Sequence, residues 1–108
     1  MKDDLVYIEN ILQSIDRIQT YISGKDQGTF ISDFITQDAV VRQLEIIGES
    51  TKRVSKDFRN NNPDIPWTDM AGMRDVLIHD YIDVDLEIVW KTASESIPIL
   101  KALLEKLV

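Results

Sequence analysis

The residues best suited to chemistry in this chain lie in one short stretch, Arg74 to Tyr81. It contains the only histidine, His79, and an imidazole can take up and release a proton near neutral pH. Arg74 offers a planar guanidinium that can hold a phosphate group through its fork of donors. These residue types together favour phosphodiester chemistry, in which the 2′-hydroxyl of an RNA could attack the phosphorus without a metal ion.

Two further side chains belong to the same stretch. Asp75 lies four residues before His79, so a helix places both on one face, where the carboxylate can orient the imidazole. Tyr81 lies seven residues after Arg74, nearly on one face with it, and adds a phenol. The stretch therefore offers a cation, an acid/base group, an orienting carboxylate and a phenol within about two helical turns.

The spacing of Arg74 and His79 limits how they can act together. Five residues on an ideal helix turn through about 140°, so the two side chains point apart. They converge only if the helix ends between them or if a second copy contributes its own pair, which makes a homodimer part of the mechanism. A purely structural alternative is that Asp75 pairs with His79 on the surface while Arg74 bridges to a neighbouring acid.

The elements that must position this stretch are predicted to be helices. Apolar residues recur at three- and four-residue steps over about 4–23, 37–60, 66 to 79 or 81, and from 86 onward. The stripe of the first helix comprises Leu5, Ile8, Leu12, Ile15, Ile18 and Ile22. No segment alternates convincingly at period two, so the fold class is predicted as all-α, an antiparallel bundle.

Residues expected to cap the helices, and a proline and a glycine inside them, refine this prediction. Thr36 is expected to cap the second helix and Asp85 the last one. Pro98 removes a backbone donor and should bend the last helix. Gly48, inside the second helix, predicts a close contact with another helix. Trp67 and Trp90 are expected in the core.

The length, composition and net charge limit the classes of protein to which the chain can belong. The chain has 108 residues, so residues 1–108 are predicted as a single domain. It contains no cysteine and one histidine, so we expect neither a metal site nor a cofactor. No signal peptide or membrane span is recognisable, which predicts a cytoplasmic protein. The net charge of −7 argues against a protein that coats nucleic acid but permits a local basic groove.

Two charged groups outside the stretch remain open to two interpretations. Arg42, Glu45 and Glu49 follow a helical rhythm, and they form either a solvated face with ion pairs or a lining of the dimer cleft. The notable basic cluster comprises Lys52, Arg53, Lys56 and Arg59. This cluster could follow an RNA backbone, meet an acidic partner, or simply be a solvated face.

Arg74, His79 and Tyr81 fit the pattern Arg-x4-His-x-Tyr, which resembles the HepT-like toxins of the HEPN superfamily. The resemblance extends to residues 36–49, 65–74 and 84–90, and it covers roughly residues 5 to 105. A bare Arg-x4-His string would be a weak signal, but these surrounding blocks make it specific.

The resemblance implies a four-to-five-helix HEPN bundle that forms a homodimer. Its paired motifs build a metal-independent endoribonuclease cleft that leaves 2′,3′-cyclic phosphate ends, with Arg74 and His79 catalytic. It further implies the toxin of a type VII toxin–antitoxin pair, neutralised when an MntA-like nucleotidyltransferase adds AMP to Tyr81. The superfamily often has asparagine or another polar residue where this chain has Asp75, which puts the rate of cleavage in doubt.

Two other functions stay open at this point. The chain could be a non-catalytic binding or regulatory partner of a minimal nucleotidyltransferase, which its acidic charge favours. It could also be a structural helical dimer whose motif has decayed, although the intact Arg74, His79 and Tyr81 argue against this.

Overall fold

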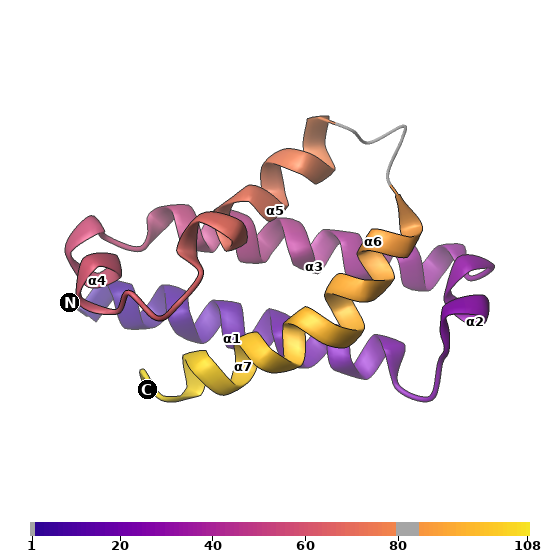
Figure 1. The fold of residues 1–108 in the computed structure, drawn as a ribbon, viewed down its shortest axis with the longest axis horizontal. Helices are drawn as coiled ribbons and strands as arrows, with labels where there is room; N and C mark the ends of the chain where they lie inside the picture. Colours follow the sequence, from indigo (N-terminus) through magenta and orange to yellow (C-terminus); the bar gives the residue numbers. More distant parts are fainter. Residues whose placement is uncertain (1, 80–84) are drawn as a thin grey trace.

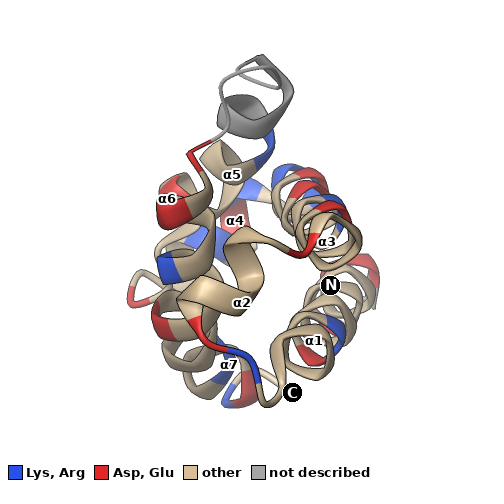
Figure 2. Cartoon of the chain, turned by 90° about the vertical axis from the view of Figure 1, so that its right-hand side faces the viewer, with Lys and Arg blue, Asp and Glu red and all other residues tan. Residues whose placement is uncertain are grey.

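The computed structural model describes residues 2–79 and 85–108, and all regular structure in these two ranges is helical. The elements are α1 (Lys2–Ile22), α2 (Gln27–Ile31), α3 (Phe34–Arg53), α4 (Lys56–Asn61), α5 (Trp67–His79), α6 (Leu86–Lys91), a π-helical turn η2 (Thr92–Ser96) and α7 (Ile97–Glu105). The long helices α1 and α3 run antiparallel and side by side (Figure 1). Helix α6 packs against α2 and α3, and η2 and α7 pack against α1. Figure 2 shows α2 crossing one end of the bundle. The predicted all-α antiparallel bundle is confirmed.

The first helix supplies one wall of the core. Its fully buried residues are Ile8, Ile11, Ile15 and Ile18, which follow the helical three- and four-residue steps. Leu5, predicted in the stripe, is instead 40% exposed, and Ile11 takes a central place that the prediction omitted. The stripe is thus rotated slightly from the one that the sequence pattern suggested.

The second predicted helix is two helices, so the prediction of one helix from 37 to 60 is wrong. Val54 and Ser55 adopt extended backbone angles, with ψ of 134° and 153°, between α3 and α4. The Ser55 hydroxyl accepts a hydrogen bond from the Phe58 amide and caps α4. The buried Asp4 carboxylate in turn accepts bonds from the Ser55 amide (2.7 Å) and hydroxyl (2.8 Å). This contact joins the start of α1 to the break and holds the pKa of Asp4 below its ordinary value.

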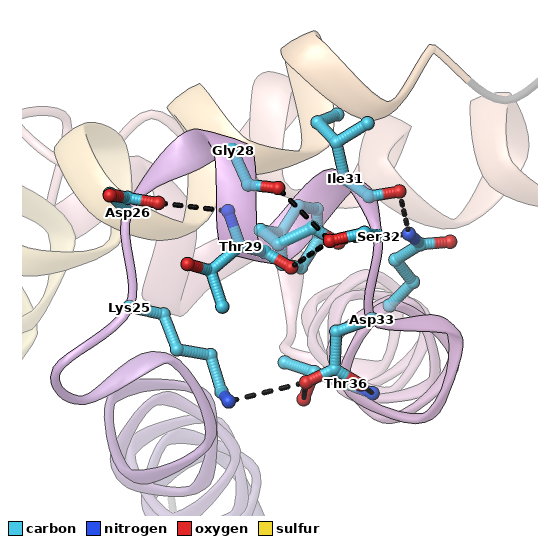
Figure 3. Close-up of polar contacts among 10 residues, drawn as sticks. Lys25, Asp26, Gly28, Thr29, Ile31, Ser32, Asp33 and Thr36 are labelled. Atoms are coloured by element: carbon cyan, nitrogen blue, oxygen red, sulfur yellow. Dashed lines mark hydrogen bonds and ion pairs between the residues drawn. The ribbon is translucent and has the colours of Figure 1, made fainter.

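The start of α3 also differs from the prediction, because Asp33, and not Thr36, is its N-cap. The Asp33 carboxylate accepts bonds from the Thr36 amide (3.0 Å) and hydroxyl (2.6 Å) and pairs with Lys25 at 3.2 Å (Figure 3). Chiefly through the Thr36 hydroxyl and amide, the pKa of Asp33 falls to about 2. Thr36 therefore serves as the donor to the cap.

A short helix, α2, fills the segment that the sequence left as a connection. Asp26 caps it by accepting a bond from the Thr29 amide at 2.8 Å (Figure 3). Phe30 is fully buried, and its ring lies 5.3 Å from that of Trp90 on α6. Helix α2 thus covers the end of the core through a contact between aromatic rings that are distant in the sequence.

The last segment begins as predicted and then departs from regular helix. Asp85 caps α6 by accepting bonds from the Glu87 and Ile88 amides. The π-helical turn η2 comes directly before α7, which has Pro98 in its first turn. A proline ring collides with the carbonyl four residues earlier, here that of Ser94, so a widened turn accommodates it. The predicted disturbance by Pro98 is therefore seen on its N-terminal side.

Within the described residues, no helix is both long enough and apolar enough to cross a membrane.

Candidate active site

The helix that carries the candidate residues, α5, is anchored firmly at its start. Trp67, its first residue, is 8% exposed, and its indole nitrogen donates to the Asn62 carbonyl at 2.9 Å. The ring of Phe58 packs edge-on against that of Trp67, with centroids 6.2 Å apart. The predicted core position of Trp67 is confirmed, and it fixes where α5 leaves the bundle.

The middle of α5 lies directly against α3, at Gly48. A Cβ atom built on Gly48 would lie 2.5 Å from the backbone nitrogen and 2.6 Å from the Cβ of Arg74. Carbon atoms in good contact are about 3.5–4.0 Å apart, so only glycine permits this approach. The predicted close helix contact at Gly48 is confirmed, and its partner is the candidate catalytic arginine.

An acidic side chain next to this contact faces the guanidinium of Arg74. The Nε atom of Arg74 lies 3.9 Å from a carboxylate oxygen of Glu49, whose other oxygen lies 3.7 Å from Arg53. Both side chains are accessible to solvent: that of Arg74 is 38% exposed and that of Glu49 is 52% exposed. Exposed pairs of this kind contribute little to stability, so any role of the pair would be to hold the guanidinium beside Glu49.

The charged face of α3 has the ion pairs that one of the two interpretations predicted. Arg42 lies 3.6 Å from Glu45, three residues on, and Glu49 pairs with Arg53, four residues on. The bridge from Arg74 to an acid, part of the structural alternative, is also present. The sequence did not single out Glu49 as that acid, although its place directly after Gly48 was the available signal.

The remaining candidate residues are only partly within the described structure. The backbone of α5 is helical through Asp75 and His79, but their side chains lie outside the described part. Tyr81 lies outside the described residues altogether. Because α5 continues to His79, the helix does not end between Arg74 and His79, and the two positions remain about 140° apart around its axis.

Among the described side chains, which do not include those of residues 75–84, no three of His, Cys, Asp or Glu come together to hold a metal ion.

The described residues form a small all-α domain, an antiparallel bundle in which the helix that carries Arg74 and His79 packs closely on Gly48 of its neighbour. A family model described as ribonuclease HepT-like matches residues 11–107. The chain therefore belongs to the ribonuclease HepT-like family.

Several named proteins are similar over nearly the whole chain. A protein of Thermococcus cleftensis named "Probable ribonuclease HepT" is 46% identical over 94% of this chain and 92% of its own. Proteins provisionally named as RNases come from Caldanaerobacter subterraneus (41% identical, 94% of this chain and 90% of that one) and Methanocaldococcus jannaschii (40% identical, 99% and 92%). No solved structure matches the chain.

Proposed function

We propose that this chain is a metal-independent endoribonuclease that works as a homodimer, with residues 1–108 forming one cytoplasmic domain. Membership of a ribonuclease family supports the RNA substrate. The observation that carries the two-chain site is the continuity of α5, which leaves Arg74 and His79 of one chain about 140° apart. An Arg74 from one copy and a His79 from the other can then face one phosphate.

The proposed reaction needs only groups of the two chains and the RNA. One His79 takes the proton of the 2′-hydroxyl while its oxygen forms a bond to phosphorus. The bond to the 5′-oxygen breaks, and the partner's protonated His79 supplies the proton to that leaving oxygen. Arg74 holds the non-bridging oxygens as negative charge gathers on them, and Asp75 holds the imidazole in place. The products are a 2′,3′-cyclic phosphate and a 5′-hydroxyl.

Cleavage of a labelled RNA by the purified protein, in the presence of EDTA, tests this proposal. His79→Ala removes both the general base and the general acid of the proposed dimer, so it should slow cleavage by at least about 10²–10⁴-fold, the usual contribution of one such group. Arg74→Ala should also slow it. Arg17→Ala, which removes an exposed arginine from α1, should leave the rate unchanged. Identical RNA profiles for the wild type and His79→Ala would contradict the proposal.

A mixing experiment separates a two-chain site from a one-chain site. The Arg74→Ala homodimer lacks both arginines and the His79→Ala homodimer lacks both histidines. A heterodimer of the two retains one Arg74 and one His79 on different copies, so it keeps one of the two proton-transfer groups and should cleave more slowly than the wild type but faster than either variant alone. Unfolding and refolding the two variants together should restore part of the activity. If both residues had to come from one chain, the mixture would stay inactive.

We further propose that the enzyme is the toxin of a toxin–antitoxin pair, switched off by AMPylation of Tyr81 by an MntA-like nucleotidyltransferase. An AMP group there would bring a bulky anion to the RNA cleft and repel the substrate. Coexpression with such a transferase should add the mass of AMP to the intact protein, and Tyr81→Phe should prevent this. Unmodified wild-type protein after coexpression would count against this regulation.

The net charge of −7 favours one alternative, a non-catalytic partner of the nucleotidyltransferase. This alternative predicts that the chain copurifies with the transferase and that the free dimer cleaves no RNA under any condition.

A further inference from the structure

A basic groove lies at the junction of α4 and the start of α5, away from the Arg74–Glu49 pair. It encloses about 560 Å³. Its lining comprises Lys56, Arg59 and Asn60 of α4, residues 63 and 65–66 of the connection, and residues 67–69 of α5. Figure 1 shows this junction at the end of the bundle where α1 begins. Two cationic side chains thus line a recess large enough for a phosphate with its sugar.

The Arg59 side chain enters this groove with unused hydrogen-bonding capacity. Its Nε atom is buried, and among the described residues it has no hydrogen-bond partner. Buried donors in native proteins are nearly always paired, so the guanidinium of Arg59 is not fully used by the described chain. Because its Nε atom is closed to solvent, an anion in the groove would have to bind the terminal nitrogens, and arginine binds phosphate well through its planar fork.

The start of α5 adds further donors to the same recess. The first helical bond of α5 runs from the Met70 amide to the Pro66 carbonyl. Thr68 and Asp69 line the groove, and their amides have no backbone acceptor in the part of the chain that the structure describes. A helix N-terminus favours negative charge, and α5 is thirteen residues long.

One acidic group opposes this preference. The Asp69 side chain also lines the groove, and its carboxylate repels an anion. The groove lining thus carries two positive charges against one negative charge.

The register of α5 relates the groove to the candidate catalytic position. Positions 68 and 79 are eleven residues apart, which is about 20° around the axis and about 16 Å along it. The groove therefore lies on the same face of α5 as position 79, at the opposite end of the helix. An RNA strand following this face would reach from one to the other within a few nucleotides.

We propose that this groove binds a backbone phosphate of the RNA, a few nucleotides from the scissile bond. This inference rests on the proposed ribonuclease function for its choice of ligand. The groove then sets where along α5 the strand lies, and so contributes affinity without sequence preference.

Binding of a labelled single-stranded 2′-fluoro RNA, which lacks the attacking hydroxyl, tests the groove separately from cleavage. Lys56→Ala with Arg59→Ala should weaken binding about tenfold, the loss of roughly one charge-assisted hydrogen bond. The slope of log affinity against log salt should become shallower by about 0.7, as expected for one phosphate released from a single strand. Asp69→Asn should tighten binding, because it removes the opposing charge.

Two further variants show whether weaker binding is specific to the groove and is not caused by misfolding. Arg17→Ala with Lys91→Ala changes the net charge equally at exposed positions outside the groove and should leave both affinity and salt slope near wild type. Lys56 is exposed, so Lys56→Ala alone should fold normally and still weaken binding if Arg59→Ala proves unstable.

Two results would overturn the proposal. One is an affinity and salt slope for the groove variants that match those of the Arg17/Lys91 control. The other is unchanged RNA binding with loss of copurification with a nucleotidyltransferase, which would assign the groove to a protein partner. If the protein bound the probe through the groove but cleaved no RNA, the proposed catalysis would be refuted, while the proposed phosphate binding by the groove would still hold.

Discussion

Replacing Gly48 by alanine is expected to push α5 away from α3 and so to destabilise the protein. The added Cβ would lie 2.5 Å from the Arg74 nitrogen, and a contact of about 3.5 Å requires a shift of roughly 1 Å. The atoms in the way belong to the backbone and Cβ of Arg74, so no flexible side chain can yield. The strain must therefore be relieved by moving a helix.

Two opposing terms set the magnitude. Alanine in a helix interior is favoured over glycine by about 1 kcal/mol. Overpacking a tight contact costs about 1–3 kcal/mol, and a rigid helix backbone places this site in the upper part of that range. The net expectation for Gly48→Ala is a loss of about 1–2 kcal/mol, which lowers the melting temperature by several degrees.

Gly72→Ala provides the matched control, because a Cβ atom there meets nothing within 4 Å. It should gain up to about 1 kcal/mol from helix propensity alone. Urea unfolding followed by circular dichroism measures both variants, at equal protein concentration because the proposed dimerisation would contribute to apparent stability. If the two substitutions change stability in the same direction by similar amounts, the close approach at Gly48 is not what limits the contact.

Two shorter predictions concern the electrostatics. The pKa of Asp33 falls from 3.8 to about 2 on folding, so its contribution to stability is complete above pH 4 and is lost as the pH falls towards 2. As the pH is lowered across this window, the melting temperature should fall less steeply for Asp33→Asn than for the wild type. If the two plots of melting temperature against pH ran parallel, the Asp33 cap would not be the cause of the acid destabilisation. Glu49→Gln should leave the melting temperature almost unchanged, because its ion pair with Arg74 is largely exposed. In cleavage kinetics it should lower KM, by removing a competing carboxylate, and also lower kcat, by loosening the guanidinium; unchanged values of both would show that Glu49 does not position Arg74.

The sequence predicted those parts of the fold that depend on local pattern. The isoleucine spacing of α1, the cap at Asp85 and the tight contact at Gly48 each follow from residues close together in the chain. The break at Ser55 could not be predicted in this way, because the carboxylate that stabilises it comes from Asp4, fifty-one residues earlier. A helical stripe continued through Phe58, so the periodicity itself concealed the break.

In the candidate site, too, the sequence predicted what depends on local residue pattern and missed what depends on how the helices pack. The types and spacing of Arg74 and His79 were sufficient to nominate a chemistry and to predict that the two side chains converge only if the helix ends between them or a second copy contributes its own pair. The partner of Arg74 depends on how α3 and α5 cross, which the sequence pattern does not encode, so Glu49 was identified only from the structure. The short helix α2 was missed because five residues are too few to show a period.

The acidic composition is compatible with binding an anionic substrate, because many acidic groups are held in structural roles. Asp26, Asp33 and Asp85 lie at helix N-termini, where each accepts backbone hydrogen bonds and offsets the positive end of a dipole. Figure 2 shows acidic and basic positions interspersed along α1 and α3. The potential that an RNA strand meets depends on nearby charges, because at physiological ionic strength those more than about 8 Å away are largely screened. The pair Lys56 and Arg59 can therefore hold a phosphate although the whole molecule carries −7.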